Sequence, residues 1–364
     1  MIKLFKPYIS EEARQNVQRI LLSDQIAEGE EVKLFEQELE EKLGKKNIVT
    51  LNSGSSALEL AYELANINEG DEVITPVLTC TATNLPLVRR KAKIVFADIT
   101  NDLNIDIEDV KKKITPKTKA IVFVHFGGNN RGLADLVAIC RERNIALIED
   151  AAQAITSDFW GQGDYTAVSL QAIKTITSGD GGLLITKTEE DYKKAKKLRW
   201  FGYDRELKQK LGDCDLDLAG YKYHMNNISA SIGRGNLLHI DAIKIHINAL
   251  GDIYKSYGLF AHAWLAGGFT NNYKGLKQRM ADAGYEIGQH HYKNSKYSLF
   301  KDFPAVCPIM DSIEHNYYFV PLNHSVSLLQ AHKIGGIIKE WEEKNSIQKN
   351  RQEKDIERQV KDMP

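Results

Sequence analysis

Short apolar segments alternate with helix-like segments through the first half of the chain, and this alternation restricts the possible folds most strongly. The predicted strands cover residues 48–51, 72–76, 93–97, 120–125 and 146–149. Segments between them, such as 57–65 and 133–143, have the length and apolar spacing of helices. Strands that alternate with helices in this way favour a mostly parallel sheet covered on both faces. In such a sheet, ligands bind beyond the carboxyl ends of the strands.

A carboxylate and an amine follow two of the predicted strands. Asp150 ends the apolar strand at 146–149, and Lys174 follows a short strand at 167–170 and precedes a glycine-rich turn at 177–182. Pyridoxal phosphate chemistry requires both groups at neighbouring strand ends. The amine forms a Schiff base with the aldehyde, and the carboxylate keeps the pyridine nitrogen protonated so that the ring accepts electrons.

Each of these residues also has a structural interpretation. A lone lysine in a loop is usually a surface residue. Asp150 could cap a helix that begins at Ala151, a contribution of ~1 kcal/mol. Gln153 could complete a capping box, or it could donate a hydrogen bond to the phenolic oxygen of the cofactor. The pairing of Asp150 with Lys174 favours the functional interpretation.

The turn Ser53-Gly54-Ser55-Ser56 opens a helix directly after a strand. Backbone N–H groups and the helix dipole at such a position favour a bound phosphate. An ordinary helix cap is the more common meaning of this pattern, so the signal is weak by itself. Ser169 could add a hydroxyl to the same phosphate, or it could be a satisfied buried serine.

The chain has 364 residues, which suggests one large domain and a smaller one. We predict a large domain over 1–238 and a smaller α+β domain over 239–364. The second part has helical segments near 238–266 and 274–284 around short strand-like pieces. From about residue 336 the chain is charge-dense, and we expect a solvated helix that ends in disorder.

Composition excludes several functions. The formal net charge is -1, so the chain has no basic field for nucleic acid or an anionic membrane. No apolar stretch approaches the ~18 residues of a membrane span, and the N-terminus lacks the pattern of a signal peptide. We therefore expect a cytoplasmic protein. The four cysteines are far apart and lack zinc-type spacing, so reduced thiols are expected: Cys80, Cys140, Cys214 and Cys307.

Several motifs occur in an order that identifies a family resemblance. They are the phosphate turn at 52–58, the acid motif at 148–154, the lysine motif at 169–182, and the segments 199–205 and 220–226. Together, over nearly the full length, they resemble the DegT/DnrJ/EryC1/StrS family of sugar aminotransferases. These proteins have the α/β fold type I of aspartate aminotransferase. The resemblance implies a large domain that binds pyridoxal 5'-phosphate (PLP) and a smaller α+β C-terminal domain.

The resemblance also assigns roles to individual residues. Lys174 would bind the cofactor covalently, Asp150 would pair with the ring nitrogen, and Gln153 would pair with the phenolic oxygen. The phosphate would be held by Gly54, Ser55 and Ser169. The segment 220–226 would reach across a homodimer into the phosphate site of the partner.

The chain departs from the family pattern at several positions. Cys80 stands where relatives usually stack an aromatic ring on the cofactor, and Lys222 replaces a common asparagine and could bind phosphate in the partner as a point charge. The segment 158–164 is short. The region 240–280 also looks shortened and lacks the usual strand pattern, which puts substrate contacts there in doubt.

The pair His290-His291 precedes Tyr292 and resembles the histidine–tyrosine element on the substrate side of the family's site. His291 and Tyr292 are therefore candidate contacts to a hexose or a diphosphate. A histidine pair can also suggest a metal. Adjacent residues of a strand face opposite ways, however, so we expect no metal site.

The resemblance implies transamination of a nucleotide-linked keto-deoxysugar, with glutamate as the amino donor. Relatives that carry histidine in place of the lysine are sugar dehydratases, so Lys174 favours transamination. A same-fold dehydratase is one alternative. A non-catalytic regulator with this fold is another, because fold alone does not determine function.

Overall fold

The computed structural model describes the backbone of residues 1–361 and the side chains of residues 1–345. A seven-stranded sheet lies at its centre, in the order β1-β8-β7-β6-β5-β2-β4. Its strands are β1 (Ile48–Leu51), β2 (Glu72–Pro76), β4 (Lys93–Ala97), β5 (Thr118–Val124), β6 (Ala146–Asp150), β7 (Tyr165–Ser169) and β8 (Gly182–Thr186). Neighbouring strands from β4 to β7 are parallel, and β8 runs antiparallel between β7 and β1. The predicted α/β class with a mostly parallel sheet is confirmed.

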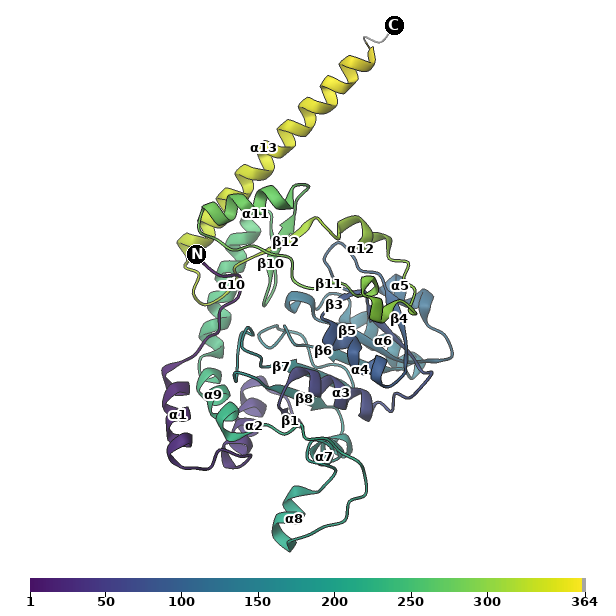
Figure 1. The fold of residues 1–364 in the computed structure, drawn as a ribbon, viewed down its shortest axis with the longest axis vertical. Coiled ribbons are helices and arrows are strands. Elements are labelled where there is room, and N and C mark those ends of the chain that lie inside the picture. The colour runs from purple at the N-terminus through teal and green to yellow at the C-terminus, as the bar shows by residue number, and fades with distance from the viewer. Residues whose placement is uncertain (362–364) are drawn as a thin grey trace.

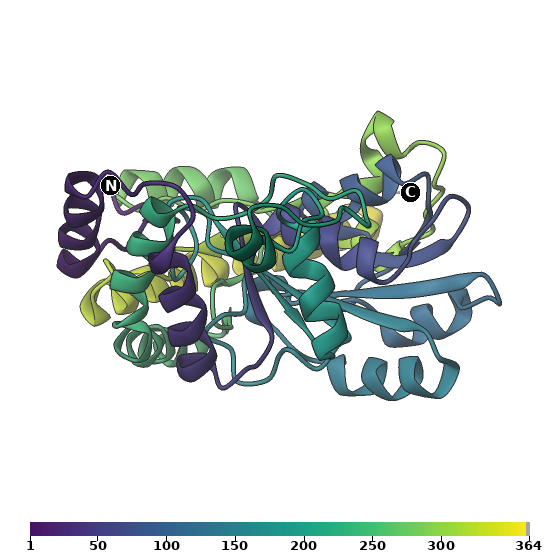
Figure 2. The same cartoon turned by 90° about the horizontal axis from the view of Figure 1, so that it is seen from below.

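Helices cover both faces of this sheet (Figures 1 and 2). The helices are α1 (Glu11–Leu22), α2 (Glu30–Leu43), α3 (Gly54–Leu64), α4 (Thr81–Arg89), α5 (Ile107–Lys113), α6 (Leu133–Arg143), α7 (Glu189–Leu198), α8 (Arg205–Leu211), α9 (Asn227–Leu237), α10 (Ile240–Ser256), α11 (Tyr273–Asp282), α12 (Pro308–Ile313) and α13 (Leu328–Lys361). Successive strand residues enter different apolar clusters. Val122 packs in the cluster that contains α3, and Phe123 packs in the one that contains α6. Burial on both faces explains why these strands are continuously apolar in sequence.

A second, three-stranded sheet lies in the C-terminal part of the chain, in the order β12-β10-β9. Its strands are β9 (Phe260–Ala261), β10 (Ala266–Phe269) and β12 (Tyr317–Val320). The expectation that residues 240–280 lack the strand pattern is therefore wrong. The strands are short, and β10 contains Gly267 and Gly268, which carry little strand propensity. Gly267 is required here because a Cβ would lie 2.0 Å from the carbonyl oxygen of Tyr318.

Residues from each predicted domain pair with residues of the other domain. Ile2 bridges to Tyr285, and strand β11 (Tyr292–Lys293) pairs with β3 (Leu78–Thr79). The short 3-10 helices η2 (Asn294–Lys296) and η3 (Ser298–Phe300) follow β11. Phe300 then packs edge-on against Phe96 of β4, with ring centroids 5.9 Å apart. The domain boundary at 238/239 thus remains a prediction.

Two helices extend from the body of the molecule. In Figure 1, α8 projects at the end of the chain segment that follows α7, and α13 projects at the opposite end. In the first turns of α13, Ala331, Ile334 and Ile338 are buried, and the helix packs against α10 and α11 before it continues to Lys361. The predicted disordered end falls on residues 362–364, outside the described residues.

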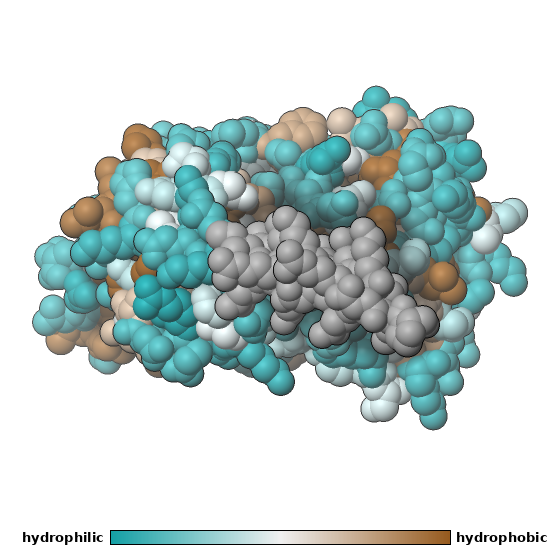
Figure 3. Space-filling view, turned by 90° about the horizontal axis from the view of Figure 1, so that it is seen from above, coloured by the Kyte–Doolittle hydropathy of each residue, from teal (hydrophilic) through white to brown (hydrophobic). Residues whose placement is uncertain are grey.

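The surface around α13 is mainly hydrophilic, with separate apolar patches (Figure 3). Within the described part of the chain, no helix combines the length and apolar character needed to cross a bilayer.

Candidate active site

The predicted site residues meet at one edge of the central sheet. Because β1, β2 and β4–β7 run in one direction, their carboxyl ends share an edge, and β8 begins there. The Ser53 turn follows β1, Cys80 follows β3, Asp150 ends β6, and Lys174 follows β7. The sheet topology therefore brings together residues that are up to 121 positions apart in sequence (174 minus 53).

Lys174 lies in a compact turn between β7 and β8. Its backbone N–H donates to the carbonyl oxygen of Gln171 at 2.8 Å, and Ser178 N–H donates to Leu170 O at 2.9 Å. Burial lowers the pKa of Lys174 from 10.5 to about 8, although the nearby charges of Asp150 and Cys80 oppose this change. An amine with this pKa loses its proton much more readily than a surface lysine, so it can serve as nucleophile or base.

Asp150 is buried, with 4% of its surface exposed. Its Oδ2 accepts a hydrogen bond from Thr83 Oγ1 at 2.7 Å, and its Oδ1 accepts one from the N–H of Ala152 at 3.2 Å. Thr83 in turn lies 2.8 Å from Thr79 Oγ1. Residues after Asp150 form a turn instead of a helix, so the helix-cap alternative is wrong. Sequence reasoning missed Thr83, which fixes the orientation of the carboxylate from α4.

The turn after β1 has the form expected for a phosphate site. Ser53 caps α3 by accepting from the N–H of Ser56, and Gly54 and Ser55 follow Ser53 in the first turn. The first N–H groups of a helix lack partners within the helix. A Cβ on Gly54 would lie 2.8 Å from the Cβ of Ser169. Glycine is thus what allows the turn to lie directly against Ser169, as the predicted shared phosphate contact requires.

Gln153 connects the sheet edge to the C-terminal part of the chain. Its Oε1 accepts from the N–H of Gly127 at 2.6 Å, and its Nε2 lies 3.0 Å from Nε2 of His291. With Oε1 accepting, Nε2 is the donor, and His291 accepts through Nε2. The capping-box alternative is wrong, since no helix begins here. One N–H of the Gln153 amide remains available for a ligand.

Phe5, Trp264, His290 and His291 form an aromatic cluster at this edge. Phe5 stacks on Trp264 with centroids 4.7 Å apart, and His290 lies edge-on to both rings at 4.9 and 5.1 Å. The Nζ of Lys174 lies 4.1 Å from the centroid of the Trp264 ring. The cluster thus borders the amine directly. Sequence reasoning missed Phe5 and Trp264 because no local motif marks them.

The two histidines do not face opposite ways as predicted. Their ring centroids are 3.8 Å apart. His291 has φ +64, a left-handed conformation that breaks the strand alternation before β11 begins. Burial and the charge of Lys174 lower the pKa of His290 to about 3, and burial also holds the pKa of His291 well below its ordinary value. Both rings are therefore neutral near pH ~7.

Three further predicted residues lie near this edge with different degrees of exposure. Cys80 is half-buried at the start of α4, and burial raises the pKa of its thiol. Tyr292 is 38% exposed in β11. Lys222 is exposed, and its neighbour Tyr223 accepts a hydrogen bond from the backbone N–H of Asn52 at 2.7 Å. Segment 220–226 thus lies beside the phosphate turn of its own chain, and its role toward a partner remains a prediction.

A buried His125–Glu149 pair lies beneath the site and was not predicted. His125 Nε2 is 2.7 Å from Glu149 Oε2, and both side chains are fully buried. The short segment 158–164 supplies three backbone N–H donors to this carboxylate, from Gly161, Gln162 and Gly163. Burial opposes the charge, but these hydrogen bonds and His125 lower the pKa of Glu149. The short segment therefore stabilises the strand that carries Asp150.

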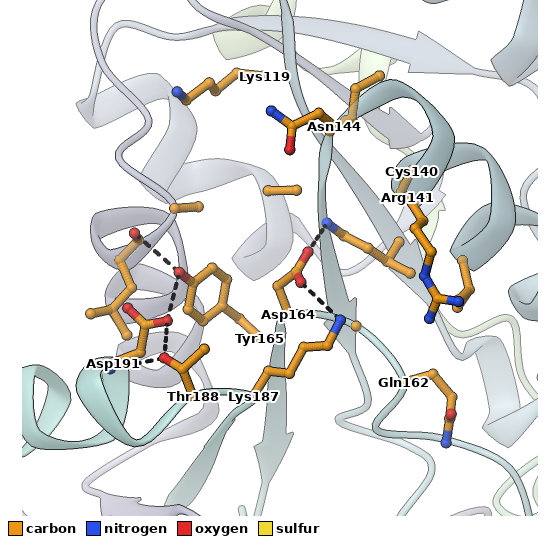
Figure 4. Close-up of a pocket in the computed structure, with 17 residues that line it drawn as sticks. Lys119, Cys140, Arg141, Asn144, Gln162, Asp164, Tyr165, Lys187, Thr188 and Asp191 are labelled. Atoms are coloured by element: carbon orange, nitrogen blue, oxygen red, sulfur yellow. Dashed lines mark hydrogen bonds and ion pairs between the residues drawn. The ribbon is translucent and has the colours of Figure 1, made fainter.

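A groove of about 430 Å³ lies at the opposite edge of the sheet, at the amino ends of β6 and β7 (Figure 4). Several of its polar groups already have partners. Asp164 accepts from the N–H of Leu147 at 2.9 Å and lies 3.3 Å from Lys187 Nζ, and the Tyr165 hydroxyl donates to Leu64 O at 3.2 Å. Among the described residues, no three histidine, cysteine or carboxylate side chains gather as metal ligands.

Comparison with known proteins places the chain in a family. The family model described as "DegT/DnrJ/EryC1/StrS aminotransferase family" matches residues 7–259. The chain belongs to this aminotransferase family. It is 34% identical over 261 residues to the spore coat polysaccharide biosynthesis protein SpsC of Bacillus subtilis, covering 69% of this chain and 67% of that protein. It is 33% identical over 263 residues to GDP-perosamine synthase of Vibrio cholerae, covering 70% of each.

Solved structures of similar proteins extend the match to the small C-terminal sheet. The sugar aminotransferase CalS13 from Micromonospora echinospora aligns with a TM-score of 0.88 at 26% identity, over 93% of this chain and 100% of that chain. A Streptococcus pneumoniae protein in its PMP-form aligns with a TM-score of 0.86 at 25% identity, over 94% and 100%. That protein is also known in a PLP-form.

The residues present fit PLP, the cofactor of this family. Two glycines keep the phosphate turn against neighbouring backbone, since a Cβ on Gly182 would lie 2.2 Å from Ser53 O and one on Gly54 would contact Ser169. A buried carboxylate with fixed orientation, Asp150, and a desolvated amine, Lys174, supply the two groups that the ring and aldehyde require.

Proposed function

We propose that this enzyme transfers an amino group to a nucleotide-linked keto-deoxysugar, with PLP as cofactor and glutamate as amino donor. The observation that carries the proposal is the desolvated amine of Lys174 at the same sheet edge as Asp150 and the phosphate turn. A dehydratase of this fold would lack that lysine. A non-catalytic protein would have no use for an amine held at a lowered pKa.

The names of two relatives support the substrate class. GDP-perosamine synthase is named for a nucleotide-linked sugar. So is the dTDP-4-dehydro-2,3,6-trideoxy-D-glucose 4-aminotransferase of Saccharopolyspora spinosa, which is 29% identical over 248 residues. A sugar that carries a nucleotide diphosphate needs polar and cationic contacts outside the reaction centre. We assign His291 and Tyr292 to the sugar or diphosphate, because His291 touches Gln153 and Tyr292 follows it at an exposed position.

The side chains of this chain then have distinct tasks. PLP, when bound, supplies an aldehyde that exchanges amines and a ring that withdraws electrons. Asp150, oriented by Thr83 and the N–H of Ala152, would hold the ring nitrogen. Gly54, Ser55 and Ser169 bind the phosphate, and the Gln153 amide binds the phenolic oxygen.

Lys174 would have two roles. Its amine would hold the cofactor, and the same amine, when free, would serve as a base. With a pKa of about 8, the free amine has a substantial neutral fraction near neutral pH, so it can take a proton from the donor carbon and return it elsewhere. Cys80 lies beside this amine and would contact the ring in place of the aromatic side chain of relatives.

We further propose a cytoplasmic homodimer with shared sites, in which Lys222 binds the phosphate of the partner. Its exposed ammonium, on a segment beside the phosphate turn, supports this role. The four free thiols fit a reducing compartment.

Absorbance spectroscopy tests the reaction. Purified holoenzyme should lose the band of the lysine-bound cofactor when glutamate is added, and recover it when a nucleotide-linked 4-keto-6-deoxysugar follows. A band that glutamate leaves unchanged would reject the donor. A band that the keto sugar does not restore, while simple 2-oxo acids do, would reject the sugar substrate.

A further inference from the structure

We propose that Trp264 is a positioning residue that holds the free amine of Lys174 on the face of its indole ring. The inference rests on the proposed function, because it concerns the state in which Lys174 is detached from the cofactor. Its evidence is independent of the cofactor, since it lies in contacts within this chain. The ammonium Nζ is 4.1 Å from the ring centroid, well within the ~6 Å range of cation–π attraction.

The indole ring is fixed on several sides. Its Nε1 donates to the carbonyl oxygen of Ile173, the residue before Lys174, at 3.3 Å. The backbone N–H of Trp264 donates to the carbonyl oxygen of Gly127 at 2.8 Å. Phe5 stacks on the ring at 4.7 Å, and His290 lies edge-on at 5.1 Å. A ring fixed in this way presents a prepared surface to the amine.

The other groups around the amine come from three elements. Asp150 at the end of β6 and Cys80 before α4 act on the amine as negative or potentially negative groups. His290 and His291, from the segment before β11, carry no opposing charge, because their pKa values lie well below neutral. Among the described residues, the contact recorded for the Lys174 ammonium is the face of the Trp264 ring.

This contact has a consequence for the reaction. A displaced lysine that is free to rotate would lose the geometry it needs for proton transfer. An ammonium held on the ring stays at the sheet edge, and the contact favours its charged form against desolvation. Trp264 therefore sets both the place and the protonation of the amine.

Competitive labelling of the full-length, cofactor-free protein tests this directly. Trace acetic anhydride is applied across a pH series, and the peptide that contains Lys174 is quantified by mass spectrometry, with other lysine peptides of the same digest as references. Trp264→Leu should lower the pKa of Lys174 by about one unit, because the cation–π contribution is lost. Trp264→Phe keeps a ring face but loses the N–H donor, and should shift it by less.

Fluorinated tryptophan provides a second measurement that does not depend on the Leu variant folding. Fluorine withdraws electron density from the ring, so the pKa of Lys174 should fall stepwise with the number of fluorine atoms. The matched control is the same fluorination of the Trp264→Phe variant. There only the other tryptophans carry fluorine, so the pKa of Lys174 should not change. A merely structural role of Trp264 would leave the pKa unmoved.

A Lys174 pKa that fluorination does not change overturns the proposal, whatever the Leu variant does. This result is distinguishable from failure of the proposed function. Labelling reports on the lysine and the indole alone, whereas the proposed function fails when the absorbance band of the holoenzyme does not respond to glutamate or to the keto sugar.

Discussion

The two edges of the central sheet differ in how their polar groups are satisfied. At the carboxyl edge, the amine of Lys174 has a pKa lowered to about 8 by burial, and His291 has a left-handed backbone. At the amino edge, the groove of about 430 Å³ contains acidic groups and a tyrosine that already have partners within the chain. The groove is a hollow in the surface, but the reactive chemistry lies at the other edge.

The comparison shows that shape alone is a poor guide to function in this fold. Polar groups that pair with each other stabilise a structure, and few of their donors and acceptors remain free to bind a ligand. Groups held at a shifted pKa, or in a strained conformation, persist only where the surrounding structure supports them. Parallel strands that end at one edge supply that support.

The largest expected difference between the edges concerns their lysines. Lys174→Ala should abolish transamination, because the nucleophile and the base are lost together and each role is worth roughly 10²–10⁴ in rate. Lys187→Ala, at the groove, removes an exposed ion pair and should leave the rate within about twofold. Steady-state turnover of both variants, with circular dichroism as the control for folding, provides the check. Normal turnover of Lys174→Ala would show that the active site does not lie at the carboxyl edge.

The second difference concerns the aspartates. Asp150→Asn should lower turnover by about 10²–10³ while the cofactor stays bound, because a neutral amide cannot stabilise a protonated ring nitrogen but phosphate anchoring remains. Asp164→Asn at the groove should leave turnover nearly unchanged. Rates and equilibrium dialysis of the cofactor, measured on the same preparations, separate the two effects. If Asp150→Asn turns over normally, the ring nitrogen has another partner or none.

At the carboxyl edge, unlike the amino edge, we expect a second chain to complete the site through Lys222. Lys222→Met should weaken cofactor binding by ~1–3 kcal/mol, the usual loss for a charge-assisted hydrogen bond. Cofactor titration of the purified variant measures this change. Wild-type affinity in Lys222→Met would show that the lysine is a solvated surface residue.

Mixing variants sharpens this test. When Lys174→Ala and Lys222→Met protomers exchange, a dimer with shared sites gives one site with both lesions and one with neither. Activity above both parents is therefore expected, provided that Lys222→Met alone is strongly impaired. No gain despite proven subunit exchange would contradict the role in the partner.

The smallest effect concerns stability. Because the pKa of Lys174 falls from 10.5 to about 8 on folding, the unfolded chain binds more protons between these values. The free energy of unfolding therefore rises with pH across this window. Cofactor-free Lys174→Met should be more stable than the parent by about 2 kcal/mol near pH ~7, and this advantage should shrink from pH 8 to 10.5. Urea unfolding across the pH range measures the difference, and Lys187→Met should show no such gain.

The sequence predicted those parts of the fold and site that depend on local patterns. Strand 93–97 and helix 133–143 have the predicted bounds, and Asp150 and Lys174 do lie at one sheet edge. Phe5 and Trp264 could not be found this way, because they reach the site only through packing between segments far apart in sequence. Gly267 and Gly268 concealed strand β10 for a different reason. Glycine has a low strand propensity, and Gly267 is present because it lies close to the backbone of Tyr318.

The histidine pair was misread because the strand rule was applied where no strand exists. A left-handed residue reverses the expected alternation, and only the backbone angle of His291 reveals it. Thr83 could not be predicted for a related reason. No motif marks this residue in its helix, and its role is to donate a hydrogen bond to the carboxylate of Asp150, which is distant in sequence.

Borohydride reduction tests the central claim most directly. Hydride converts a carbon–nitrogen double bond between cofactor and lysine into a stable amine, and peptide mass spectrometry then identifies the modified residue. We predict that, after incubation with stoichiometric PLP, the phosphopyridoxyl group is found on Lys174 and is lost in Lys174→Ala. A label on Lys119 or Lys187 at the groove, with Lys174 unmodified, would contradict the assignment of the active site to the carboxyl edge.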